Sequence, residues 1–195
     1  MVSVCPSYLR HHFRVCNDHV SPSTSVRDLG IYLDSDVSMR TQVSRTVSQC
    51  FGILSLLRPV RRSVSQSVFQ SLVAALVLTK LDFGNATLAG VPSVLLDRLQ
   101  AVMNAAARLV FQSSLYDHVT PLLHRLHWLR TPERISYKLT VLVFQCTHGL
   151  GLVYLSDTIQ PVARIPGRRR LRSSSTSANA QYTLLRDADA TQLSS

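Results

Sequence analysis

The chain has 195 residues, and its hydrophobic content of 46% is ordinary for a globular protein, which argues against wholesale disorder. The 21 Lys and Arg residues outnumber the 11 Asp and Glu residues, so the formal net charge is +10 at pH 7. Nineteen of the basic residues are Arg, whose planar guanidinium binds phosphate through paired hydrogen bonds. This balance favours a nucleic acid or another anionic partner over the alternative, an Arg-biased composition on a solvated face.

Cysteine spacing and hydropathy indicate the cellular compartment in which the protein is expected. The four cysteines lack CxxC spacing, which favours reduced thiols over a disulfide scaffold or a zinc site; they are Cys5, Cys16, Cys50 and Cys146. Charged residues between Arg10 and Arg14 interrupt any signal peptide, and the uncharged run from Ser63 to Thr79 is too short and polar to span a membrane. We therefore expect a soluble intracellular protein, in the nucleus or the cytoplasm, with no membrane partner.

The first predicted element is a short strand from Val26 to Leu33, in which Gly30 permits close approach of another backbone. Asp34 and Asp36 follow it. Their spacing would place both on one face of a strand as metal ligands, but LDSDVS favours a turn that ends the strand. The chain has no adjacent acidic pair, no GxxxxGK[ST] loop, no GxSxG elbow and no HExxH motif, so we expect no enzyme activity from it.

Two helices are predicted next. From Arg40 apolar residues recur every three or four positions, and Pro59 ends the pattern; the predicted core face is Val43, Val47, Phe51, Leu54 and Leu57. Ser63 and Gln66 form a capping-box pattern before the second helix. Its apolar stripe is wide, so we expect burial over much of its circumference. The main row is Val64, Val68, Leu72, Leu76 and Lys80, with Phe69, Val73 and Val77 beside it.

Three further helices follow a loop at Gly84 to Pro92. The first runs from about Ser93 to Phe111, with a core face of Leu95, Leu99, Val102, Ala106 and Leu109. Small residues from Ala105 to Ala107 would let a neighbouring helix or a duplex approach. Thr120-Pro121 and Thr131-Pro132 predict the starts of the other two. The last has the buried stripe Ile135, Leu139, Leu142, Val143 and Cys146, and Gly149 stops it.

Some residues carry both a functional and a structural interpretation. His118, His124 and His127 would suit a metal by spacing, but no Cys lies nearby, and we favour a structural or surface role. For Trp128 we favour a core anchor over a base-stacking residue. The basic cluster Gly167 to Arg172, within RRRLRSSSTS, is either a localisation-like or RNA-binding patch or an unselected run.

Five segments occur in a fixed order at residues 26–39, 81–92, 99–111, 116–129 and 132–157. They read VRDLGIYLDSDVSM, LDFGNATLAGVP, LQAVMNAAARLVF, YDHVTPLLHRLHWL and PERISYKLTVLVFQCTHGLGLVYLSD. Together they resemble the region that follows the catalytic palm in reverse transcriptases of non-LTR (LINE-type, jockey/CR1-like) retrotransposons. The resemblance covers roughly residues 20–172, with mild departures at Phe83, where Tyr is usual, and Lys80, where Arg is usual.

The resemblance implies a fragment of an RNA-directed DNA polymerase. The family's aromatic-x-Asp-Asp turn, which holds two Mg²⁺ ions with a further carboxylate, is absent from these 195 residues, as is its later Trp-Asn-x-Leu-Pro block. We therefore expect no cofactor in this chain, Mg²⁺ in its parent, and loss or divergence at both ends. The implied parts are 1–38, a remnant of the palm's last strands; 39–90, thumb-like helices; 91–160, post-thumb helices; and 161–195, a disordered basic Ser/Arg-rich tail.

In the family the thumb packs along the duplex of RNA template and DNA primer, which requires cations that reach phosphates. The candidates on or between the first two helices are Arg40, Arg45, Arg58, Arg61, Arg62 and Lys80. The alternative is a domesticated or non-functional remnant that acts as a nucleic-acid or protein binding module. Without a palm, the apolar stripe at residues 43–57 would be exposed and cause self-association. The fold we expect is mainly α: a short β segment, a bundle of about five or six helices, and a disordered C-terminal tail.

Overall fold

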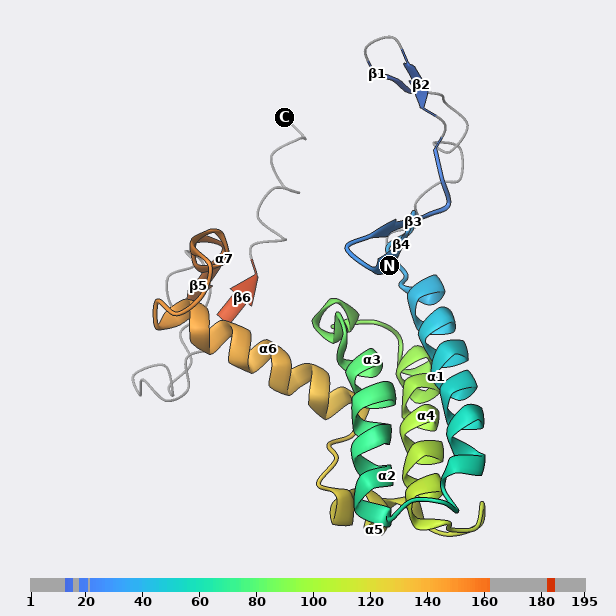
Figure 1. Ribbon diagram of the computed structural model, residues 1–195. Helices are drawn as coiled ribbons and strands as arrows, with labels where there is room; N and C mark the ends of the chain where they lie inside the picture. The colour runs from blue at the N-terminus through green and yellow to red at the C-terminus, as the bar shows by residue number, and fades with distance from the viewer. Residues whose placement is uncertain (1–12, 16–17, 21, 162–181, 185–195) are drawn as a thin grey trace. The chain divides into compact units, whose positions relative to one another are not determined.

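The computed structural model describes residues 13–15, 18–20, 22–161 and 182–184. It is mainly helical, as predicted, with short antiparallel strands ahead of the helices (Figure 1). The chain divides into two compact units, Met1–Ile135 and Ser136–Ser195. The predicted divisions after residues 38 and 90 both fall inside the first unit. The cluster Gly167 to Arg172 and most of the predicted disordered tail lie outside the described residues.

Each pair of strands near the N-terminus is an antiparallel hairpin. β1 (Phe13–Val15) pairs with β2 (Asp18–Val20), and β3 (Ser25–Asp28) pairs with β4 (Ile31–Asp34). The prediction of one strand across residues 26–33 is therefore wrong. The chain reverses at Leu29 and Gly30, whose φ angles of 45° and 87° are both positive, the backbone that two-residue hairpin turns use.

The next helices form an antiparallel pair. α1 (Arg40–Val60) ends one residue beyond Pro59. α2 (Gln66–Val73), the π-helical turn η2 (Ala74–Leu78) and α3 (Thr79–Asp82) then run back as one continuous rod. Figure 1 shows this rod beside α1 and α4. Ser65, and not Ser63, caps α2, because the Ser65 hydroxyl accepts the Val68 amide at 3.5 Å.

The buried faces of these helices differ from the predicted rows. In α1 the core residues are Val43, Cys50, Leu54 and Leu57, while Phe51 remains 39% exposed. In the rod, the predicted secondary row of Phe69, Val73 and Val77 is fully buried, whereas Val68 and Leu76 of the main row are 51% and 43% exposed. A strict four-residue row drifts around a helix of 3.6 residues per turn, so it cannot stay on one face.

The 3₁₀ turn η3 (Asn85–Leu88) lies within the predicted loop and precedes α4 (Ser93–Phe111), whose bounds match the prediction. Arg98 donates to the Ser44 hydroxyl at 3.1 Å, and Arg61 donates to the Val110 carbonyl at 3.1 Å. Because these contacts join the starts and the ends of the helices, α1 and α4 run parallel. The buried residues of α4 are Leu95, Leu99, Val102, Met103, Ala106, Ala107 and Val110, and Leu109 is only half-buried.

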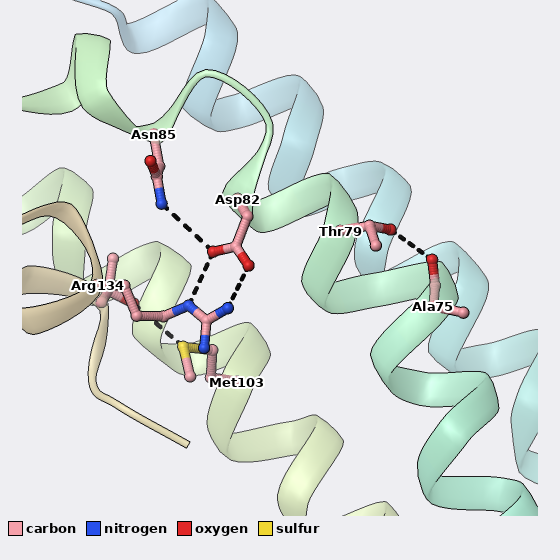
Figure 2. Close-up of polar contacts among 7 residues, drawn as sticks. Ala75, Thr79, Asp82, Asn85, Met103 and Arg134 are labelled. Atoms are coloured by element: carbon pink, nitrogen blue, oxygen red, sulfur yellow. Dashed lines mark hydrogen bonds and ion pairs between the residues drawn. The ribbon is translucent and has the colours of Figure 1, made fainter. Parts of the chain in front are cut away.

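α5 (Val119–Leu126) starts one residue before the predicted Thr120 cap, with His118 at its N-cap. α6 (Thr131–Thr147) begins in the first unit, where its first turns bind the rest of the fold. The Thr131 amide donates to Gln100 Oε1 at 2.9 Å. Arg134 forms a bidentate ion pair with Asp82, in which Arg134 Nε and Asp82 Oδ1 are 2.8 Å apart (Figure 2). Asn85 donates to the same Asp82 oxygen at 3.3 Å, so the LDFGN segment is joined to α6.

The second unit holds the rest of α6, α7 (Val153–Thr158), and the strands β5 (Ile159–Pro161) and β6 (Tyr182–Leu184), which pair antiparallel. Of the predicted tail at residues 161–195, the described residues are Pro161 and 182–184, which lie in these strands, and the rest lies outside the described residues. Gly149 ends α6 as predicted, with a φ of 69°, and the Leu150 amide bonds the Gln145 carbonyl at 2.8 Å. A Cβ at Gly151 would lie 2.9 Å from the Cys146 Cα, so only glycine fits there.

The predicted exposure of the stripe at residues 43–57 is wrong. Val43, Leu54 and Leu57 are 0%, 6% and 7% exposed, because α4 and the α2–α3 rod cover this face of α1. Self-association through that stripe loses its physical basis. Among the described residues, no helix combines the length and the apolar character that crossing a bilayer requires.

We expect that replacing Ala106 by Leu destabilises the first unit. Ala106 is fully buried on α4, so the extra methylene and methyl groups have no space, and the free energy of unfolding should fall by about 1–3 kcal/mol. Ala101→Leu, at an exposed position of the same helix, is the matched control and should change it by less than about 0.5 kcal/mol. Urea unfolding followed by circular dichroism measures both, and equal effects would contradict the packing of α4 described here.

Candidate nucleic-acid interface

Two basic clefts lie at opposite ends of α1. The first, here named the Tyr32 cleft, has a volume of about 430 Å³ and lies between the β3–β4 hairpin, α1 and α3. Its cations are Arg27, Arg45 and Lys80. The second, here named the arginine cleft, has a volume of about 580 Å³ and lies between the ends of α1 and α4. Its cations are Arg58, Arg61, Arg62 and Arg108. Among the residues that the structure describes, none with an acidic side chain lines either cleft.

The hairpin register builds the Tyr32 cleft. Arg27 and Tyr32 are directly opposite each other on β3 and β4. The guanidinium carbons of Arg27 and Arg45 lie 5.7 Å and 4.5 Å from the centre of the Tyr32 ring, within the range of cation–π attraction. The Tyr32 amide donates to Gln42 Oε1 at 2.9 Å, which ties β4 to α1. The ring therefore holds two guanidinium groups at the mouth of the cleft.

The turn after the hairpin fixes where α1 begins. Asp34 Oδ2 accepts the Thr41 amide at 3.0 Å and the Ser38 hydroxyl at 3.2 Å, so this carboxylate caps α1. Asp36 Oδ1 accepts the Ser38 amide at 3.0 Å. Partial burial raises the pKa of Asp34, but the hydrogen bonds from Thr41 and Ser38 outweigh it and hold the pKa below its ordinary value. The carboxylates of Asp34 and Asp36 thus accept hydrogen bonds within a turn, as predicted, and this arrangement does not fit a metal site.

The π-helical turn η2 precedes the residues that α3 contributes to the Tyr32 cleft. It inserts a wider turn before Thr79 and Lys80, and the Thr79 hydroxyl donates to the Ala75 carbonyl (Figure 2). Such turns are frequent at functional sites. Burial raises the pKa of the Cys50 thiol to about 11, although the positive charge of Lys80 acts to lower it. Cys50 is therefore a neutral core residue rather than a nucleophile.

The arginine cleft combines free cations with cations that hold the fold. Arg61 is half-buried, donates through Nε to the Val110 carbonyl at 3.1 Å, and lies 5.3 Å from the centre of the Phe69 ring. Arg108 donates to the Asp117 carbonyl at 3.3 Å, and its buried Nε finds no hydrogen-bond partner among the described residues. Arg58 and Arg62 are exposed at the rim. The Nε atom of Arg108 is itself out of reach of solvent, so Arg58 and Arg62 are the most accessible cations of this cleft for a phosphate.

The six predicted cations do not form one surface. The interval from Arg45 to Arg58 is about three and a half helical turns, so these two arginines are attached on nearly opposite sides of α1. Arg40 lines neither cleft and is exposed at the first position of α1. The pKa of Asp36 is lowered mainly by hydrogen bonds from Ser38, and the charge of Arg40 lowers it further. Phosphate contacts at the two clefts would therefore be separate.

Sequence reasoning missed two of the cations. Arg27 would have been found by recognising the turn at Leu29 and Gly30, because the hairpin register then places Arg27 opposite Tyr32. Arg108 was expected to face away from the core of α4, and no local signal shows that it meets the end of α1. In contrast, His124 and His127 are exposed, and Trp128 is half-buried. Among the described residues, no group of three or more His, Cys, Asp or Glu side chains is placed to hold a metal ion.

No family model, curated protein or solved structure matches this chain.

We expect Asp34→Ala to destabilise the fold by about 1 kcal/mol at pH 7, the usual effect of losing a helix cap. Because the pKa of Asp34 is lower in the folded chain, its contribution is complete above the unfolded pKa and is lost as the pH falls through the folded pKa. The difference from the wild type should thus shrink below about pH 4. Urea unfolding between pH 3 and pH 7 measures it.

Asp34→Asn is the matched control, since its amide oxygen still accepts a hydrogen bond but does not titrate. It should lose less stability than Asp34→Ala at pH 7. A difference between wild type and Asp34→Ala that stays constant over the whole pH range would contradict the cap.

Proposed function

We propose that this chain binds nucleic acid by gripping phosphates, with the thumb-like role that its resemblance to non-LTR reverse transcriptases implies. The observation that carries the proposal is the arginine cleft, which four arginines line and to which the described part of the chain contributes no acidic residue. Guanidinium groups match phosphate geometry through paired donors, and Arg58 and Arg62 are exposed at the rim of the cleft. The Tyr32 cleft adds three further cations.

The five segments in family order suggest which nucleic acid is bound. In a parent RNA-directed DNA polymerase, this region would hold the duplex of RNA template and DNA primer while the palm, with its Mg²⁺ ions, performs the chemistry. Phosphate contacts supply affinity and position, and base pairing supplies the sequence information. The residues of this chain would thus act by binding alone, and a protein with these partners would work in the nucleus or the cytoplasm.

A second candidate, a remnant that binds a protein partner, is favoured by one observation. The second unit exposes large apolar side chains close together in the sequence: Leu150, Leu152 and Val153 are 73%, 59% and 76% exposed. Exposed apolar residues in contiguous groups mark interaction surfaces. Protein binding through these residues does not require the arginine cleft. Substitutions in the cleft therefore distinguish protein binding from nucleic-acid binding.

We expect the double variant Arg58→Gln/Arg62→Gln to weaken binding to an RNA–DNA hybrid duplex. Each lost phosphate contact should reduce the slope of log affinity against log salt by about 1, so the double variant should lose about 2. Fluorescence anisotropy with a labelled hybrid at several salt concentrations measures the slope. Arg58 and Arg62 are exposed, so their replacement should leave the unfolding curve unchanged.

The control double variant Arg125→Gln/Lys138→Gln removes the same charge from exposed positions outside both clefts. It should keep the wild-type slope within about half a unit, because neither side chain would contact phosphate. Equal losses in the two double variants would show binding to net charge alone and contradict the proposal. Absence of any salt-dependent binding by the wild type would leave the protein-binding candidate.

A further inference from the structure

Phe83 is an exposed aromatic residue in a basic cleft. It lines the Tyr32 cleft, and 55% of its surface is exposed. Its position is nevertheless well defined. A Cβ on Gly30 would lie 3.1 Å from a Phe83 ring atom, so the edge of the ring packs directly on the hairpin turn. The preceding residue, Asp82, is held by Arg134 and Asn85. An anchored ring with an open surface is suited to receive a flat ligand.

The two aromatic rings of the cleft have different surroundings. Tyr32 already attracts the guanidinium groups of Arg27 and Arg45. Within the described part of the chain, Phe83 has no stacking or cation–π partner. The rim around it carries the charges of Arg27, Arg45 and Lys80 and the exposed amide of Gln49. The cleft thus presents an apolar π-face beside cations and a side chain that can both donate and accept hydrogen bonds.

We propose that the Tyr32 cleft binds one unpaired nucleotide, whose base stacks on Phe83 and whose phosphate is bound by Arg45 and Lys80 with Arg27. Its volume of about 430 Å³ falls in the range of small-ligand sites. A base inside a duplex has both faces covered by its neighbours, so only an unpaired base offers a face to the ring. This inference rests on the proposed binding of nucleic acid and adds a single-strand site to it, at the end of α1 away from the arginine cleft.

Stacking on an aromatic ring tolerates any base, because every base has a π-face. The cleft should therefore accept unpaired residues of either RNA or DNA with little sequence preference. It should prefer a nucleic acid with a single-stranded extension over a blunt duplex of the same length.

The test uses the full chain and oligonucleotides that carry 2-aminopurine, either in a single-stranded extension or inside a blunt hybrid duplex. Phe83→Leu keeps the apolar volume but removes the π-face, and Phe83→Tyr keeps it. Stacking on an aromatic residue is strong enough that Phe83→Leu should weaken binding of the extended oligonucleotide by about 5- to 100-fold and abolish the quenching of 2-aminopurine. Phe83→Tyr should bind as the wild type does, and neither variant should alter binding of the blunt duplex.

Phe144→Leu is the matched control, since Phe144 is 54% exposed and lies outside the cleft. It should leave both affinities unchanged. A wild-type affinity for Phe83→Leu with the extended oligonucleotide would overturn the single-strand site while leaving duplex binding intact. Conversely, loss of duplex binding in Arg58→Gln/Arg62→Gln variants has no bearing on the quenching at Phe83, so the two proposals fail separately.

A measurement on the unsubstituted chain covers the case in which Phe83→Leu does not fold. A single strand containing 4-thiouridine, crosslinked by ultraviolet light and analysed by mass spectrometry, should label the peptide that contains Phe83. Labelling confined to peptides outside the Tyr32 cleft would overturn the proposal.

Discussion

The parallel packing of α1 against α4 is the constraint on which both clefts depend. Arg98 at the start of α4 binds Ser44 of α1, and Arg61 at the end of α1 binds the carbonyl of Val110 of α4, so the two helices are tied together at both ends. Leu99 and Val102 are buried on α4, and each stabilises the core by about 1.5–3 kcal/mol on transfer from water. Because the two helices share a direction, their C-terminal ends meet, and the arginines of both ends come together there.

Crowding cations at these helix ends has a cost that local interactions offset. Helix C-termini carry partial negative charge and carbonyl groups without helical partners. Arg61 satisfies one of them by donating to the Val110 carbonyl, and its guanidinium also lies over the Phe69 ring. Arg61 therefore stabilises the fold as well as contributing charge, whereas Arg58 and Arg62 remain available to a ligand. The same division holds in the Tyr32 cleft, where Arg45 is positioned by the Tyr32 ring and Lys80 is exposed.

The separation of the clefts changes how the net charge of +10 is interpreted. A single basic stripe would suggest one continuous track for a duplex. Two clefts at opposite ends of α1 instead suggest two contacts with different parts of a nucleic acid. One cleft offers guanidinium groups alone, and the other adds an open aromatic ring, which suits a phosphate backbone and an unpaired nucleotide respectively.

Local rules determined much of the secondary structure. The period of α4, the turn at Asp34 and the stop at Gly149 follow from interactions within a few residues, and the structure has them as predicted. The sequence by itself also determined the mainly helical class and the excess of arginine. The chain reversal at Leu29 and Gly30 was not predicted, because Leu is not a typical turn residue and rarely adopts a positive φ angle.

Only the tertiary structure decided which faces are buried and which cations meet. The choice of Cys50 over Phe51, and of Phe69 over Val68, depends on where α4 and the rod lie, and periodicity alone leaves neighbouring faces open. Arg108 joined the arginine cleft through packing of the end of α4 against the end of α1, two segments far apart in the chain. This packing joins whole helices into one core, a constraint that no short stretch of sequence contains.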